Sequence, residues 1–101
     1  MKDEASRILA LLGLARRAGR LAVGMSAVES MSSRAVKLLI VVASDLSDSR
    51  KEKFGRMNEN AIIISDLIDS DALAKAFNRT ELVVVAVDSP AFIKGIVNNK
   101  N

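Results

Sequence analysis

The residues best suited to binding chemistry are arginines grouped around a glycine turn in the first third of the chain. Arg16, Arg17 and Arg20 precede Gly24, and Arg34 follows it. Gly24 is placed to open a helix, and the first backbone N–H groups of a helix have no partner within that helix. Unpaired N–H groups beside cationic side chains form a site for anions. The pattern therefore predicts contact with a phosphate-rich partner.

The residue types that most enzymatic mechanisms need are missing. The 101 residues include no Cys, His, Tyr or Trp. This composition removes thiol chemistry, most nucleophile–base pairs, the commonest metal ligand and the usual side chains that stack on bases. No acid–base pair stands out either. We therefore expect a protein that is not an enzyme and that has no cofactor, no metal and no small-molecule substrate.

The charge is uneven along the chain. Residues 1–56 contain 11 Lys/Arg and 6 Asp/Glu, whereas residues 57–101 contain 4 Lys/Arg and 6 Asp/Glu. A basic first part and a slightly acidic second part favour one face that receives a polyanion. The alternative is a solvated surface whose asymmetry is accidental.

No targeting or membrane segment is expected. The first residues, MKDEASR, are too charged for a signal peptide, and no apolar run reaches membrane-spanning length. We expect a cytoplasmic protein that does not contact a membrane.

Helical and β-strand patterns alternate along the chain. Apolar residues spaced by three and four predict a helix over residues 3–18, and Gly19 is placed to end it in a left-handed conformation. Residues 36–43 and 82–87 are aliphatic runs typical of strands buried on both faces. The alternation predicts one α/β domain, residues 1–101, with helices on both faces of a sheet. The other expected elements are strands at 21–23 and 61–65 and helices at 24–32, 47–57, 70–77 and 91–97.

The expected helix starts rest on short capping patterns. The helix over residues 24–32 has Gly24 or Ser26 as its candidate N-cap, and Ser26 with Glu29 has capping-box spacing. Ser49 and Glu52 repeat that spacing. Pro90 stands where a first helical turn tolerates proline.

Asp45 is a second candidate site. It follows the strand at 36–43, where doubly wound proteins place functional groups, and there it would be a phospho-acceptor or a magnesium ligand. The alternative, which the neighbouring Ser47 and Asp48 favour, is that Asp45 caps the helix at 47–57.

Other polar or aromatic features favour structural roles. Phe54, Phe77 and Phe92 each lie in an apolar helical pattern, which favours the core over stacking on bases. The RKEK run at residues 50–53 favours a solvated helix face over an RNA contact.

Three segments together resemble a known family. They are LLGLARRAGRLAVG at 11–24, KLLIVVASD at 37–45 and DALAKAFNRTELVVVAVDSPAF at 71–92. The chain is similar to the YlxQ-like bacterial branch of the kink-turn-binding ribosomal proteins, a family named for the archaeal large-subunit protein L-seven-Ae. The resemblance covers about residues 8–97. It implies a three-layer α/β/α sandwich around a mixed sheet of about four strands.

The resemblance places the RNA site at the loop and helix that begin at Gly24. Family members show a glycine, a small residue, an asparagine and a glutamate there, and the last two contact the sheared G·A pairs of the kink. Here Met25 takes the small-residue position, Ser26 replaces the asparagine and Ala27 replaces the acid. Ser30 falls where lysine is common. Two base-reading side chains are therefore absent, and the resemblance implies altered or relaxed kink-turn recognition.

The resemblance thus implies non-catalytic binding of structured RNA, either kink-turn-like or ribosomal, by a ribonucleoprotein component. Gly24, Met25 and Ser26 are expected to approach the bases. The expected phosphate contacts are Arg16, Arg17, Arg20, Arg34, Lys37 and Arg79.

A different class of function stays open. A protein–protein adaptor on the same fold, which has lost RNA binding, is favoured by Ala27 and Ser30. Under the RNA-binding interpretation we expect a monomer that associates with the ribosome.

Overall fold

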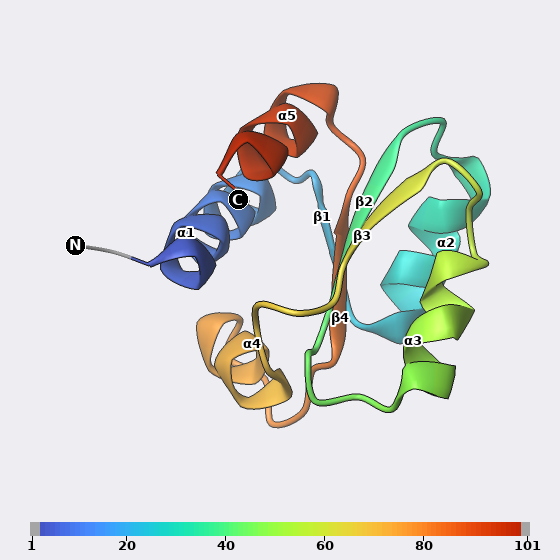
Figure 1. Ribbon diagram of the computed structural model, residues 1–101. Helices are drawn as coiled ribbons and strands as arrows, with labels where there is room; N and C mark the ends of the chain where they lie inside the picture. The colour runs from blue at the N-terminus through green and yellow to red at the C-terminus, as the bar shows by residue number, and fades with distance from the viewer. Residues whose placement is uncertain (1–2, 100–101) are drawn as a thin grey trace.

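A computed structural model describes residues 3–99 as five helices and four strands (Figure 1). The expected alternation of helices and strands is confirmed, with boundaries shifted by a few residues. In chain order the elements are α1 (Glu4–Arg17), β1 (Leu21–Val23), α2 (Met25–Arg34), β2 (Leu38–Val42), α3 (Asp48–Gly55), β3 (Ala61–Ile64), α4 (Ser70–Ala76), β4 (Val84–Val87) and α5 (Pro90–Asn98).

The strands form one mixed sheet in the order β1-β4-β2-β3. β4 is antiparallel to β1 and β2, and β2 is parallel to β3. Every residue of β2 and β4 is buried, as expected for central strands. We call the end of the sheet that is uppermost in Figure 1 the upper end. Three strands begin there, β1, β2 and β3, and β4 ends there. The opposite strand termini form the lower end.

Helices cover both faces of the sheet. α1, α4 and α5 lie on one face, and α2 and α3 lie on the other (Figure 1). The side chains of β2 alternate between the two cores: Leu39 and Val41 pack in the layer of α1, α4 and α5, whereas Ile40 packs in the layer of α2 and α3. The fold is therefore the expected α/β/α sandwich.

α1 begins and ends as its sequence predicts. The Asp3 carboxylate accepts a hydrogen bond of 2.8 Å from the Ser6 N–H, which caps the helix and lowers the pKa of Asp3 below its ordinary value. Gly19 adopts φ +73° after the last turn. The Arg20 N–H then donates to the Ala15 carbonyl at 2.9 Å, which completes a Schellman motif.

The capping boxes are not formed as predicted. Gly24 is the N-cap of α2, so Ser26 lies inside the helix and no side chain caps it. Ser47, rather than Ser49 or Asp45, caps α3 and accepts from the Arg50 N–H at 3.4 Å. In both cases the N-cap lies two residues before the serine of the predicted box.

Two further boundaries differ from the sequence prediction. α2 continues two residues past Ser32, to Arg34. β2 begins at Leu38, and Val36, which the aliphatic run predicted as strand, is 80% exposed. Phe54 and Phe77 are buried as expected, and Phe92 is partly buried against the core.

Candidate functional site

Gly24 connects β1 to α2 at the lower end of the sheet. Its backbone has φ +91° and ψ 166°, a region that essentially only glycine adopts. The Gly24 N–H donates to the Val84 carbonyl at 3.0 Å, and the Gly24 carbonyl accepts from the Val28 N–H at 3.0 Å. Because the first helical bond comes from Val28, the amides of Met25, Ser26 and Ala27 have no acceptor within α2. The start of α2 is therefore an array of N–H donors.

A second loop meets this helix start. α4 ends at Phe77, and Asn78 then adopts a left-handed conformation with φ +57°. The Arg79 N–H donates to the Ala74 carbonyl at 2.8 Å, again as in a Schellman motif. The sequence analysis did not predict this left-handed turn, although asparagine directly after a helix is a known signal for it.

The two loops bring Gly24 and Arg79 together. A Cβ atom built on Gly24 would lie 3.8 Å from Nη1 of Arg79. The Arg79 side chain is exposed, and so are Met25 and Ser26. The guanidinium thus lies beside the N–H groups that open α2, and both kinds of donor suit a phosphate. We call Gly24, Met25, Ser26 and Arg79 the α2-start cluster.

Arg16 reaches toward the same loop from α1. Its guanidinium carbon lies 5.7 Å from the centre of the Phe77 ring, within the range of a cation–π contact. Phe77 is two residues before Arg79 and is 2% exposed. The contact therefore ties the last turn of α1 to the end of α4, two residues before Arg79.

The structure does not bring the other predicted contacts to this cluster. Arg34 is the last residue of α2, and nine residues of helix rise separate it from Met25 by about 14 Å. Its Nη1 donates to Oγ of Ser30 at 2.9 Å. At the upper end of the sheet, α1 and α2 end and β1 and β2 begin. The predicted contacts that lie there are Arg17, Arg20, Arg34 and Lys37. The nine predicted residues therefore form two groups at opposite ends of the sheet.

An acidic partner accompanies the upper group. Nη2 of Arg20 lies 3.5 Å from Oδ1 of Asp88, which makes an ion pair. The same oxygen is buried and accepts no hydrogen bond from the described residues, so the contact is electrostatic in character. Because half of the Arg20 side chain is exposed, the pairing leaves the guanidinium accessible.

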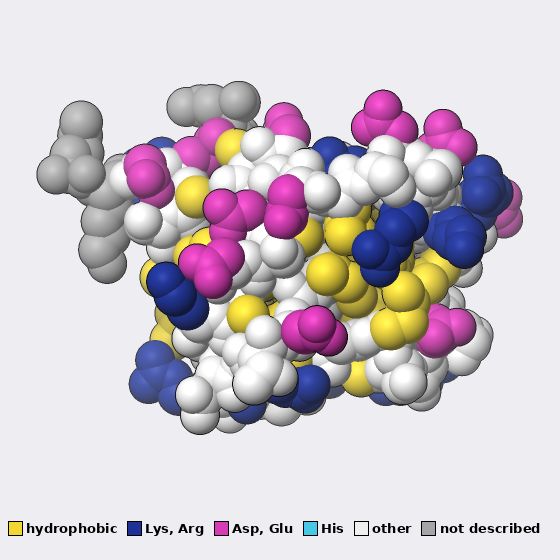
Figure 2. All heavy atoms as spheres, turned by 90° about the horizontal axis from the view of Figure 1, so that it is seen from below, with side chains coloured by type: hydrophobic (Ala, Val, Ile, Leu, Met, Phe, Trp, Pro, Cys, Tyr) yellow, Lys and Arg dark blue, Asp and Glu magenta, His cyan; other side chains and the backbone are white. Residues whose placement is uncertain are grey.

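The lower end carries both signs of charge. Figure 2 shows it from below, with basic, acidic and apolar side chains intermixed. Asp45 follows β2, Asp69 and Asp71 stand at the start of α4, and Asp48 stands at the start of α3, so acidic residues lie at the starts of α3 and α4, whereas the first turn of α2 contains none. An anion therefore has its favourable approach over the start of α2 rather than over α4.

Asp45 has a structural role that differs from the expected α3 cap. Its carboxylate accepts from the Ser70 N–H at 2.9 Å and from the Ser70 hydroxyl at 2.6 Å. These bonds to the side chain and backbone of Ser70 lower the pKa of Asp45. Asp45 thereby ties the end of β2 to the first residue of α4. Residues 3–99 contain no group of three or more His, Cys, Asp or Glu side chains that could hold a metal ion.

No helix within residues 3–99 combines the length and apolar character that crossing a membrane requires.

Solved structures resemble this chain, whereas no protein-family model and no curated protein sequence matches it. A protein of unknown function from Bacillus halodurans aligns with a TM-score of 0.72 at 24% identity, over 92% of this chain and 95% of that one. The 15.5 kD RNA-binding protein of Giardia lamblia aligns with a TM-score of 0.64 at 17% identity, over 98% of this chain and 87% of that one. At these identities the likeness shows a shared fold.

Proposed function

We propose that the chain binds structured RNA without catalysis and that the α2-start cluster is the centre of the interface. One observation carries this proposal: Arg79 of one loop lies against Gly24 of another, beside the free N–H groups of α2. The RNA-binding protein among the structural neighbours supports the same function at the level of the fold.

The cluster would hold RNA by one phosphate and one or two nucleotides. The phosphate would accept from the amides of Met25 and Ser26 and from the Arg79 guanidinium, because the guanidinium lies next to the residue that precedes these amides. The side chains of Met25 and Ser26 are exposed and would face the adjoining nucleotides. Met25 offers an apolar contact to a base, and the Ser26 hydroxyl offers one donor and acceptor.

Recognition of a kink-turn would be relaxed. Ser26 lacks the two-ended amide of an asparagine, and Ala27 has no side-chain acceptor for the edge of a guanine. Each missing base contact of this kind reduces discrimination by about 1–3 kcal/mol. We therefore propose binding to folded RNA, such as a kink-turn-like or ribosomal RNA, with a modest preference for the kink. Association with the ribosome in the cytoplasm belongs to the same proposal.

The experiment compares two exposed arginines. Arg79→Ala should weaken binding to a fluorescein-labelled kink-turn RNA roughly tenfold, which corresponds to about 1.4 kcal/mol, in an anisotropy titration. Arg56→Ala is the matched control, because Arg56 is 70% exposed and lies at the end of α3, away from the cluster. That control should change the affinity less than about twofold.

Two results would contradict the proposal. Equal losses for both variants would mean that the RNA is held by diffuse charge rather than by the cluster. A wild-type protein without measurable RNA affinity at low salt would favour the adaptor, which has no RNA affinity to lose.

A further inference from the structure

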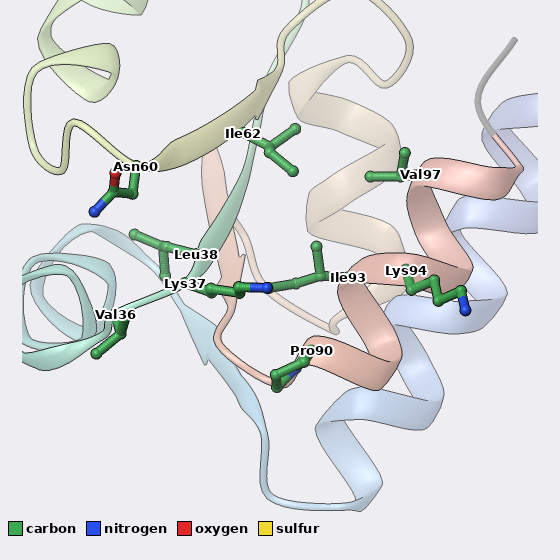
Figure 3. Close-up of a pocket in the computed structure, with 9 residues that line it drawn as sticks. All are labelled: Val36, Lys37, Leu38, Asn60, Ile62, Pro90, Ile93, Lys94 and Val97. Atoms are coloured by element: carbon green, nitrogen blue, oxygen red, sulfur yellow. The ribbon is translucent and has the colours of Figure 1, made fainter.

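A hollow opens on the surface between α5 and the edge of the sheet, at the upper end. Its volume is about 730 Å³. Ile62 of β3 and Ile93 and Val97 of α5 face one another across it (Figure 3). The full lining consists of Val36, Lys37, Leu38, Asn60, Ile62, Pro90, Ile93, Lys94 and Val97. The hollow lies at the opposite end and opposite edge of the sheet from Gly24, which follows β1.

The hollow leaves apolar side chains in contact with water. Ile62 shares a sheet face with Ile64, which is buried in the layer of α1, α4 and α5, but the helices of that layer do not cover Ile62. Val36, Ile62 and Val97 are 80%, 44% and 39% exposed. They are three of the five large hydrophobic residues exposed within residues 3–99, and all three line this hollow. Three exposed apolar side chains gathered in one hollow offer a contact surface for an apolar side chain of a partner.

The edge of the sheet beside the hollow is also open. β3 pairs with β2 along one side, and among the described residues no strand pairs with its other side. The backbone of an edge strand can accept an additional strand from another chain. An extended segment laid along β3 would direct alternate side chains into the hollow.

The positive charge of the residues that line the hollow favours a segment with acidic residues. Lys37 extends from the start of β2 toward Ile93, and Lys94 lies at the rim on α5, with its amino group directed away from the apolar floor (Figure 3). No carboxylate is among the nine lining residues. A segment with carboxylates flanking its apolar residues is therefore electrostatically complementary.

The same charges oppose a second copy of this chain as the occupant. A two-fold symmetric interface places the same patch of each copy against the other, so the two lysines of one copy would face a patch that carries the same two positive charges. RNA is also a poor fit, because the floor is aliphatic and no aromatic side chain lines it for stacking on bases.

We propose that this hollow and the free edge of β3 bind a short extended segment of a partner protein, with apolar residues at alternate positions and acidic residues at its ends. The apolar side chains fill the space between Ile62, Ile93 and Val97. The carboxylates pair with Lys37 and Lys94. This assignment gives Lys37 a role other than the phosphate contact expected from the sequence, and it does not depend on RNA binding.

The test uses a fluorescein-labelled peptide, Glu-Glu-Val-Ser-Ile-Ser-Val-Glu-Glu, and the wild-type protein. We expect saturable binding in an anisotropy titration that reaches about 1 mM protein. A peptide with Lys at the four Glu positions should bind at least about tenfold more weakly, because it repels both lysines. A peptide with Ser at the Val and Ile positions should also bind at least about tenfold more weakly.

Variants then locate the site. Ile62→Glu should weaken binding of the acidic peptide at least about tenfold, since it introduces a charge into the apolar contact. Leu14→Glu is the matched control, because Leu14 is 47% exposed on α1 and is not part of the hollow; it should leave the affinity unchanged. Lys37→Glu should abolish most of the preference for the acidic peptide over the lysine peptide, because the new carboxylate offsets the remaining charge of Lys94. Circular dichroism establishes that each variant is folded.

Four results from the peptide titrations and from sedimentation would overturn the proposal, and a fifth concerns RNA. These are no binding of the acidic peptide, equal binding of the acidic and lysine peptides, equal losses for Ile62→Glu and Leu14→Glu, or a wild-type dimer in sedimentation that Ile62→Glu converts to a monomer. The last result would assign the hollow to a second copy. A loss of RNA affinity in Ile62→Glu would instead assign it to RNA.

Discussion

Gly24 provides the sharpest test of the geometry at the start of α2. With φ +91° and ψ 166°, its backbone occupies a region that is sterically closed to residues with a Cβ. Space is not the obstacle to a larger residue, because a Cβ would lie at an ordinary 3.8 Å from Nη1 of Arg79. Any loss of stability in Gly24→Ala therefore measures the backbone conformation itself.

The size of that loss follows from the cost of the conformation. Residues held in such regions cost about 1–3 kcal/mol, so we expect Gly24→Ala to lower the free energy of unfolding by that amount. For a domain of this length, each 1 kcal/mol shifts the melting temperature by roughly 4–8 °C. Gly13→Ala is the matched control with the opposite sign. Gly13 lies within α1 with open space around it, so alanine should stabilise by about 0.5–1 kcal/mol.

Urea unfolding followed by circular dichroism measures both changes, since the chain has no Trp or Tyr for fluorescence. A neutral or stabilising Gly24→Ala would refute the reasoning, because alanine would then fit the backbone that positions the first amides of α2. A destabilising Gly13→Ala would show that the comparison does not isolate backbone strain.

Three other predictions address separate parts of the account. Restoring Ser26→Asn with Ala27→Glu should raise the preference for a kink-turn over a matched duplex at least about tenfold in competition titrations, and an unchanged preference would mean that these positions do not read bases. Arg34→Ala should alter RNA affinity less than about twofold and leave the melting temperature unchanged, because Arg34 is exposed at the C-terminal end of α2, far from Met25. A tenfold loss of RNA affinity would mean that the interface extends along α2. The pKa of Asp45, read by carboxyl NMR, should lie below its ordinary value of about 3.9 and rise in Ser70→Ala. Because the pKa of Asp45 is lower in the folded state, the Asp45–Ser70 bonds stabilise the protein above about pH 4, and this stabilisation is lost as the pH falls through that pKa. The stability difference between wild type and Ser70→Ala should therefore shrink toward low pH. A difference that grows toward low pH would contradict this assignment.

Local patterns in the sequence were sufficient to predict most of the fold. The aliphatic runs identified β2 and β4 as central strands, and Gly19 marked the end of α1. Periodicity does not fix the residue at which a helix begins, since Ser26 and Ser49 have the right spacing yet lie inside their helices. The cap is set by where the chain leaves the sheet, and that is a property of the tertiary fold.

The candidate site was only partly predictable, because it joins residues that are far apart in the chain. The basic residues were visible, but their division between two ends of the sheet follows from the direction of α2 and from the strand register. The contact between Gly24 and Arg79 spans more than half of the chain and depends on the left-handed turn at Asn78. The hollow beside α5 had no local signal, because Ile62 and Val97 each resemble core residues in their own elements.

The salt dependence of RNA binding measures how many phosphates the protein neutralises, and so tests whether the interface is confined to the start of α2. Wild-type protein would be titrated with a kink-turn RNA and a matched straight duplex between about 50 and 200 mM salt. If the interface neutralises one phosphate at Arg79 and a second at Arg16, the logarithmic slope should be about −1.4 to −1.8, which is roughly a tenfold loss of affinity over that range. The kink-turn should be modestly preferred. A slope near −5 would require cations from both ends of the sheet, and no RNA affinity at the lower salt concentration would contradict the account altogether.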